Sequence, residues 1–327
     1  MEPRSQTRAW VDREFPGSKI IPLAGDASRR RFFRIVGPDA DSRVLMEYTA
    51  PFDGSTDDML LAEVFRTADL PVARILDRNA AAGCLLVEDL GDCMLESALL
   101  EAGPGSPRAR ELYERAVNLA AEIAERGTSV LAASPRAAGP ALDAERFRFE
   151  MRFFLRHFVG DYIDCDEPPA DLGALLDVLA EGAAESPRSV LCHRDFHCRN
   201  LMLRADDTLA MVDIQDARWG PDSYDLASLL FDAYAEPDPA WIEPLTQRYR
   251  EALTAPPAAG EFGDRLRRVA AQRMLKALGT FGYQTAVLGR DRYAAAIPRT
   301  QARLRELLPA VGETRLLGRR LQDCGCL

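Results

Sequence analysis

The sequence predicts an α+β protein with two lobes, a small β-rich N-terminal lobe and a larger helical C-terminal lobe. Short apolar runs separated by turn residues fill the chain up to about residue 90. Through most of the remainder, apolar residues recur every three or four positions. The length of 327 residues is enough for about two domains of ordinary size. We therefore expect lobes at residues 1–90 and 91–327.

The N-terminal lobe is expected to contain a three-stranded antiparallel meander over residues 19–48. Turn residues at 25–28 and 37–41 separate its three apolar runs. A helix over 55–68 should follow, because Ser or Thr precedes two aspartates that suit a helix N-terminus. We interpret two further apolar runs, 72–76 and 84–88, as strands.

After residue 91, helical periodicity dominates the chain. It predicts helices over residues 108–126, 143–158, 171–184, 223–234, 241–253, 262–278 and 291–308. A stretch of different character interrupts them, in which short apolar runs surround the polar loop 193–200. A later apolar run leads into Asp213. In this arrangement Asp195, Asn200 and Asp213 can point into one pocket.

The composition excludes several classes of function. The net charge of −10 argues against a partner made of nucleic acid. Residues 1–14 lack the apolar core of a secretory signal, and no run of about 18 apolar residues could span a membrane. The seven cysteines show no paired C-x-x-C motifs, so they are expected to be free thiols. We therefore expect a cytoplasmic protein with no membrane partner.

The loop 193–200 has the residues that phosphoryl transfer requires. In that reaction the protein positions the reactants, binds metal ions against the phosphates and places a base near the attacking hydroxyl. Asp195 would accept the hydroxyl proton, and Asn200 and Asp213 would offer oxygen ligands to Mg²⁺. Asn200 follows Asp195 by five residues, as in kinase catalytic loops.

Residues 193–227 resemble the aminoglycoside phosphotransferase family, relatives of protein kinases that act on small molecules. The second signature of that family is visible in residues 213–221 and 224–227. The D-F-G and A-P-E motifs of protein kinases are absent from the sequence. The resemblance implies a protein-kinase-like fold, ATP and Mg²⁺ as cofactors, and a structural Asp225 that braces the catalytic loop.

The resemblance also implies roles for residues of the N-terminal lobe. The loop over the phosphates, where backbone N–H groups can bind anions, would consist of Gly25, Asp26, Ala27 and Ser28. Backbone groups of Glu88 and Leu90 would hydrogen-bond the adenine ring. Glu63 falls where the family has an ion-pairing glutamate. His193, in the catalytic loop, is expected to be a packed structural residue rather than a base.

One expected residue is missing. The family and protein kinases usually have a phosphate-binding lysine on the third strand, where this sequence has Met46. Lys19 and Lys276 are the only lysines, and neither can reach that position in this register. Arg31 or Arg34, on the preceding strand, is our candidate, because arginine can bind phosphate in a bidentate way. The alternative is that these arginines form a solvated strand face.

Within the family, the sequence looks most like bacterial sugar kinases that phosphorylate the anomeric hydroxyl of N-acetylmuramate and N-acetylglucosamine in cell-wall recycling. The similarity lies in Gly-Asp-Ala-Ser before an arginine- and aromatic-rich strand, the methionine on the third strand, and residues 213–217. Arg148, Arg152 and Arg156 share one face of an expected helix. That face is either solvated or the edge of a pocket for an anionic acceptor.

Two other functions stay open. One is an aminoglycoside or choline-type kinase, although the arginine-rich helix would not suit a polycationic antibiotic. The other is a non-catalytic pseudokinase that acts as a scaffold, which the missing lysine favours and the intact Asp195, Asn200 and Asp213 disfavour. Our expectation is a monomeric enzyme with a small sugar as its substrate.

Overall fold

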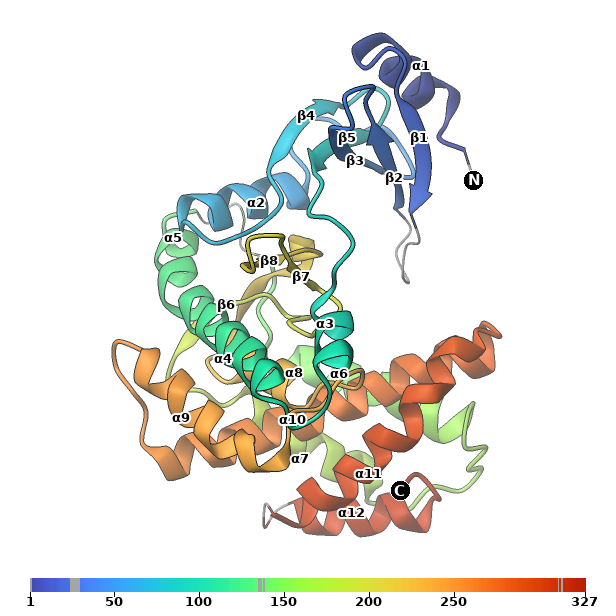
Figure 1. Ribbon diagram of the computed structural model, residues 1–327. Helices are drawn as coiled ribbons and strands as arrows, with labels where there is room; N and C mark the ends of the chain where they lie inside the picture. The colour runs from blue at the N-terminus through green and yellow to red at the C-terminus, as the bar shows by residue number, and fades with distance from the viewer. Residues whose placement is uncertain (1, 24–29, 135–136, 138, 311, 313) are drawn as a thin grey trace.

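The computed structural model describes residues 2–23, 30–134, 137, 139–310, 312 and 314–327, and shows a β-sheet above a larger helical part (Figure 1). The sheet has five antiparallel strands in the order β1 (Lys19–Leu23), β2 (Arg31–Val36), β3 (Ser42–Glu47), β5 (Cys84–Glu88) and β4 (Ile75–Asn79). The meander expected over residues 19–48 is confirmed, because β2 pairs with both β1 and β3.

The two faces of the sheet have different neighbours. One face packs beneath α1 (Ser5–Glu14), where Trp10 and Val11 meet Phe33 and Leu45 in a small core. The sequence did not predict α1, because its residues are mostly polar and only a few of them are buried. The opposite face of the sheet is directed toward the helical part and can therefore contribute to a site between the two.

Helix α2 (Asp57–Thr67) lies where a helix was expected. The Thr56 side chain caps it by accepting a backbone N–H from the first turn. Its buried residues Leu61, Val64 and Phe65 pack in the large core of the helical part rather than in the small core under α1. This helix therefore joins the sheet to the lower half of the molecule.

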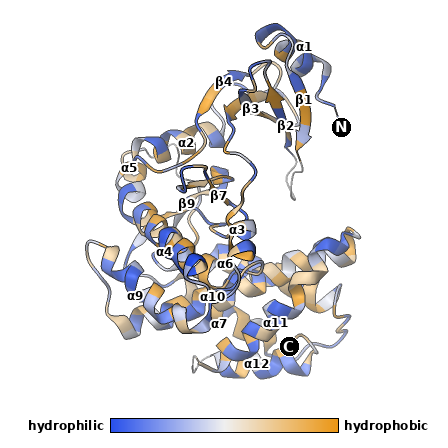
Figure 2. Cartoon of the chain, viewed as in Figure 1, coloured by the Kyte–Doolittle hydropathy of each residue, from blue (hydrophilic) through white to orange (hydrophobic). Residues whose placement is uncertain are grey.

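The remainder is mainly helical, and hydrophobic and hydrophilic residues alternate along its helices (Figure 2). The helices are α3 (Leu95–Ala102), α4 (Pro107–Glu122), α5 (Thr128–Ala132), α6 (Ala144–Phe154), α7 (Leu172–Ala184), α8 (Tyr224–Leu230), α9 (Ile242–Ala252), α10 (Ala259–Gly282), α11 (Ile297–Leu307) and α12 (Thr314–Asp323). Each helix that the periodicity predicted is present, whereas α3, α5 and α12 were not expected. Helix α10 packs against α6, α7 and α8.

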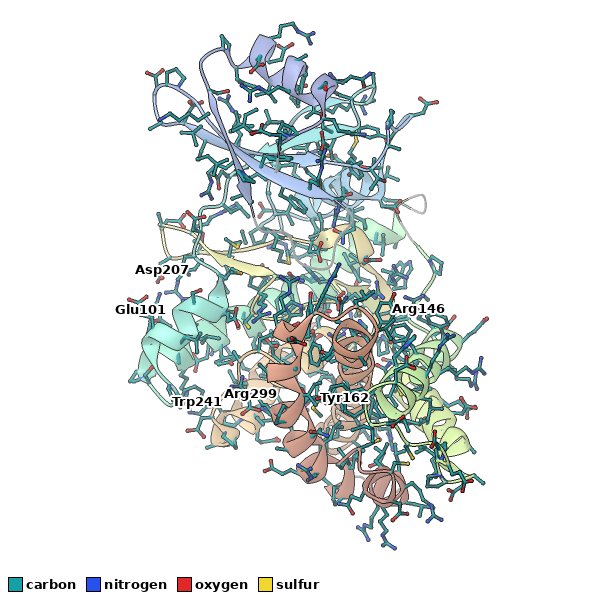
Figure 3. The ribbon with its side chains drawn as sticks, turned by 90° about the vertical axis from the view of Figure 1, so that its right-hand side faces the viewer. Glu101, Arg146, Tyr162, Asp207, Trp241 and Arg299 are labelled. Carbon is teal, nitrogen blue, oxygen red and sulfur yellow. The ribbon has the colours of Figure 1, made fainter. Side chains whose placement is uncertain are left out.

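Two short strand pairs lie between the sheet and the helices. Strand β6 (Ser189–Cys192) pairs with β9 (Arg218–Pro221), and β7 (Leu201–Leu203) pairs with β8 (Leu209–Met211). Asp207, in the β7–β8 turn, forms ion pairs with arginines of α4 and fixes the hairpin against that helix (Figure 3). The loop 193–200 connects the two pairs, because it follows β6 and precedes β7.

Two sequence expectations about the whole chain can be compared with the structure. All seven cysteines are free thiols, as predicted. None of the described helices is both long enough and apolar enough to cross a membrane.

Candidate active site

The loop 193–200 is fixed at its start by a carboxylate beneath it. Asp225, in the first turn of α8, accepts hydrogen bonds from the backbone N–H groups of His193 at 2.6 Å and Arg194 at 3.0 Å. Burial raises the pKa of Asp225 even though these bonds favour its ionised form. The His193 ring donates through Nε2 to the carbonyl oxygen of Val212, at 2.9 Å. His193 and Asp225 thus both hold the loop in place.

The Asp195 carboxylate lies among basic side chains of α10. Its Oδ1 is 3.1 Å from the Lys276 ammonium and 3.7 Å from the Arg273 guanidinium. Burial by itself would raise the pKa of Asp195, but attraction to Lys276, Arg273 and Arg194 outweighs it and holds that pKa well below its usual range. Asp195 is therefore ionised at neutral pH.

The sequence did not indicate Arg273 and Lys276 as site residues. Both residues lie on α10, about 80 positions after Asp195, and no local sequence pattern connects them to the loop. Arg273 also donates to the carbonyl oxygen of Arg194, at 2.6 Å, so it supports the loop as well as the carboxylate. The one sequence signal for Lys276 was that it is the single lysine, among many arginines, in residues 91–327.

Asn200 and Asp213 lie at the end of the β7–β8 hairpin. The Asn200 amide donates to the backbone oxygen of Asp195 at 2.9 Å, and the Val212 N–H donates to the backbone oxygen of Asn200 at 3.0 Å. Asp213 has a left-handed backbone conformation, with φ of 63°. The structure thus brings Asp195, Asn200 and Asp213 together around one loop; that they point into one pocket stays a prediction.

The donor set near Asp213 fits Mg²⁺. An amide oxygen and a carboxylate are oxygen ligands, and Mg²⁺ is usually held by one or two carboxylates together with substrate phosphates. In the described part of the chain, no group of three or more His, Cys, Asp or Glu side chains could bind a metal. Asp213 does have one cationic neighbour, since its Oδ1 is 2.9 Å from the Arg30 guanidinium. These residues would therefore serve as a metal site only together with bound phosphate.

The expected nucleotide contacts are only partly visible. Gly25, Asp26, Ala27 and Ser28 lie outside the described residues. Glu88 ends β5, and its N–H donates to the carbonyl oxygen of Arg74 at 2.8 Å. Leu90 is half-buried in the connection to α3. The adenine contacts of Glu88 and Leu90 stay a prediction.

The structure corrects the expectation for Arg31 and Arg34. Side chains alternate along a strand, so Arg31 lies on the α1 face of β2, where it pairs with buried Glu47. Arg34 lies on the other face, but it binds Asp89 at 2.6 Å and Asp92 at 2.8 Å in the connection to α3. Neither arginine is directed at the loop 193–200, and neither is a solvated surface residue.

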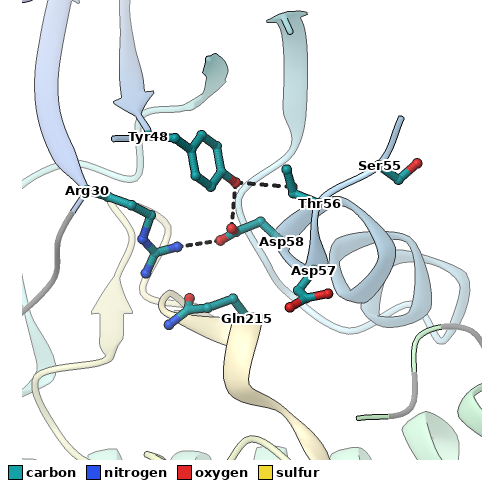
Figure 4. A pocket seen from close by; sticks show the side chains of 7 residues that line it. All are labelled: Arg30, Tyr48, Ser55, Thr56, Asp57, Asp58 and Gln215. Carbon is teal, nitrogen blue, oxygen red and sulfur yellow. Dashed lines mark hydrogen bonds and ion pairs between the residues drawn. The ribbon is translucent and has the colours of Figure 1, made fainter. Parts of the chain in front are cut away.

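The structure also corrects Glu63. Its side chain is 62% exposed and pairs with Arg66 on the same helix, at 2.6 Å. The carboxylate of α2 that faces the sheet is Asp58, which lies 2.5 Å from the Arg30 guanidinium (Figure 4). The sequence placed the ion-pairing residue on the correct helix but more than one turn too late.

The arginine-rich face of α6 is a solvated surface. Arg148 is partly exposed and pairs with the exposed Glu181 of α7. Arg152 and Arg156 are exposed as well. The α10 cations Lys276 and Arg273 lie beside Asp195 instead.

The sheet above a helical half, with a carboxylate loop between them, defines a phosphotransferase of the protein-kinase-like fold. The chain belongs to the phosphotransferase enzyme family, whose sequence pattern matches residues 19–262. This agrees with the family predicted from residues 193–227 and with the predicted two-lobe fold.

Among curated relatives, the N-acetylmuramate/N-acetylglucosamine kinase of Pseudomonas aeruginosa is 32% identical over 88% of this chain and 82% of its own. The protein of the same name from Neisseria meningitidis serogroup B is 29% identical over 91% of this chain and 89% of its own. Among solved structures, a choline/ethanolamine kinase family protein from Mesorhizobium loti matches 96% of this chain and 98% of its own, with a TM-score of 0.60 and 15% identity. That last likeness shows the fold alone.

Proposed function

We propose that the protein is a sugar kinase that transfers the γ-phosphoryl group of ATP to a hydroxyl of an amino sugar. The acceptor we infer is the anomeric hydroxyl of N-acetylmuramate or N-acetylglucosamine, a reaction of peptidoglycan recycling. The observation that carries this choice is the 32% identity, over 88% of the chain, with the Pseudomonas aeruginosa kinase named for these two sugars. We also propose that the protein is a monomer and that it lies in the cytoplasm, where ATP is available.

Each residue around the loop has a role in the proposed reaction. Asp195 orients the acceptor hydroxyl and receives its proton as the new O–P bond forms. Since the pKa of Asp195 is held very low, its contribution is chiefly to align the hydroxyl. When bound by Asn200 and Asp213, Mg²⁺ would neutralise charge on the phosphate oxygens. Lys276, in contact with Asp195, places a positive charge beside the position where the acceptor must bind.

The charges near Asp195 favour a neutral or anionic acceptor over an aminoglycoside. Lys276, Arg273 and Arg194 all act on this carboxylate. A polycationic antibiotic would be repelled by these groups, whereas the lactyl carboxylate of N-acetylmuramate would be attracted. This observation argues against the aminoglycoside-kinase alternative. The intact catalytic loop argues against the scaffold alternative.

A panel of acceptors tests the proposed function. The protein, ATP and Mg²⁺ are incubated with N-acetylmuramate, N-acetylglucosamine, choline and kanamycin, and ADP release and product position are measured. We expect turnover with the two amino sugars and a product labile to mild acid, as an anomeric phosphate is. Phosphorylation of choline or kanamycin without sugar turnover would overturn the proposal.

A further inference from the structure

Arg30 occupies the place where a third-strand lysine would act. The register pairs Phe32 with Met46 and Arg31 with Glu47. Because side chains alternate, Arg30 lies on the same face of the sheet as Met46, two positions before Phe32. The Arg30 guanidinium donates to the Met46 sulfur at 3.5 Å. The positive charge of Arg30 therefore lies next to the end of the Met46 side chain, and Met46 stands where the family usually has the lysine.

Asp58 holds this guanidinium in a defined orientation. Asp58 Oδ1 is 2.5 Å from Arg30, and both side chains are only 13% exposed. The other carboxylate oxygen of Asp58 accepts a hydrogen bond from the Tyr48 hydroxyl at 2.5 Å. Burial and the charge of Asp58 raise the pKa of Tyr48, so this hydroxyl stays protonated as a donor. Active kinases require an ion pair between a strand lysine and a helix glutamate. Here Arg30 stands in for the lysine and Asp58 for the glutamate.

Arg30 also reaches the catalytic half of the molecule. Its second terminal nitrogen is 2.9 Å from Asp213 Oδ1, and the Gln215 amide donates to the same oxygen at 2.9 Å. Arg30 and Gln215, together with Tyr48 and Asp58, line one open pocket between the sheet and the start of α2 (Figure 4). A nucleotide phosphate bound near Asp213 would lie within reach of this guanidinium.

We propose that Arg30, oriented by Asp58, binds the nucleotide phosphates in place of the missing third-strand lysine. This inference rests on the proposed use of a nucleotide, but not on which acceptor is phosphorylated. One terminal nitrogen of Arg30 stays on Asp58, and the other, which donates to Asp213 in this structure, can bind a phosphate oxygen in its place. Asp58 is a positioning residue, because it acts on phosphate through Arg30.

Nucleotide affinity tests the inference directly. Arg30→Ala should raise the dissociation constant for ATP·Mg²⁺, measured by calorimetry without any acceptor, about 10-fold or more. The same variant should raise the KM for ATP but leave the KM for sugar unchanged. Arg66→Ala removes an exposed arginine of α2 and should alter neither value. Unchanged ATP affinity in a folded Arg30→Ala protein would overturn the inference.

Two further variants separate a phosphate-binding role from a structural one. Met46→Lys in the Arg30→Ala background should recover most of the lost ATP affinity, because the ammonium would then extend from the usual strand position. Asp58→Asn should weaken ATP binding, and Asp58→Glu should restore it in part. If Arg30 only stabilised the fold, the added lysine would not restore affinity, and thermal melting would fall in parallel with binding.

Failure of this inference can be distinguished from failure of the proposed function. If the wild type binds ATP but phosphorylates no sugar, while Arg30→Ala loses binding, the inference stands and the acceptor is wrong. If sugar turnover is seen and Arg30→Ala binds ATP normally, the inference fails alone. A wild type that binds no nucleotide overturns both.

Discussion

At the scale of single residues, the site is organised by the charge balance around Asp195. This carboxylate offsets positive charge from Lys276 and Arg273, both of which are largely buried. Its low pKa means that it favours the folded state above the ordinary aspartate pKa, near 4, and that this contribution is lost as pH falls toward the folded-state value. Catalytic and stabilising roles therefore coincide in one side chain.

Asp195→Asn should abolish turnover while ATP binding persists. The amide lacks the negative charge that aligns the acceptor hydroxyl and cannot receive its proton, so kcat should fall at least about 10³-fold. The variant should also melt at a lower temperature, because Lys276 and Arg273 lose their counter-charge. Differential scanning fluorimetry at neutral pH measures this second effect. An increase in melting temperature would show that the basic residues do not depend on Asp195.

Lys276 should favour an anionic acceptor. In Lys276→Met one positive charge beside Asp195 is gone, so the KM for N-acetylmuramate should rise more than the KM for neutral N-acetylglucosamine. Lys276→Arg keeps the charge and should keep the wild-type ratio of the two KM values. An unchanged ratio in Lys276→Met would contradict this role.

At the scale of elements, helix α10 sets the position of these charges. It packs against α6 and the turn after it at very short range, because small residues lie in the contact. A Cβ on Gly282 would be 2.4 Å from the carbonyl oxygen of His157, and one on Gly279 would be 2.9 Å from the Cα of Phe154. Any side chain here would push α10 away from α6 and would move Lys276 with it.

Gly282→Ala should therefore destabilise the protein by about 1–3 kcal/mol in urea unfolding. The turnover number should fall as well, because α10 carries the residues that hold Asp195. Gly260→Ala is the matched control on the same helix, since a Cβ there meets nothing within 4 Å. The control should be neutral or slightly stabilising, by up to about 1 kcal/mol. Equal effects from the two substitutions would show that helix propensity, rather than close packing, governs α10.

The elements also show which features the sequence could predict. Periodicity located the helices, and the spacing from Asp195 to Asn200 located the catalytic loop. The structure corrects both phosphate-binding candidates, because a strand pattern does not show that Arg31 faces α1 or that Arg34 pairs with Asp89. The residue we propose instead, Arg30, directly precedes Arg31. Lys276 could not be predicted, since its contact with Asp195 depends on the packing of α10.

At the scale of the whole molecule, α2 belongs to the N-terminal lobe by its place in the chain but to the helical half by its packing. It follows the first three strands and was assigned to the lobe at residues 1–90, yet its apolar face packs in the large helical core. Asp58 at its start meets Arg30 from the sheet, which in turn meets Asp213 from the lower half. The sheet and the helical half are thus joined by a chain of charged side chains, at the place where we propose that the nucleotide binds.

A fragment of residues 1–90 should consequently fail to fold as an independent unit. Cut from the remainder, it would expose Leu61, Val64 and Phe65, which at about 25 cal/mol per Å² is a loss of several kcal/mol. The small core under α1 is too limited to compensate for that loss. We expect no cooperative thermal transition in circular dichroism, whereas the full chain should show one.

Hydrogen exchange in the intact protein provides the complementary measurement. Amides of α2 should exchange at the rate of the helical half, because they open with that core, and the sheet should open separately and at lower free energy. ATP·Mg²⁺ should slow exchange most in the sheet residues near Arg30, since phosphate binding would tie the sheet to Asp213. A cooperatively folded 1–90 fragment, or α2 amides that exchange with the sheet, would assign α2 to the sheet lobe instead of to the helical half.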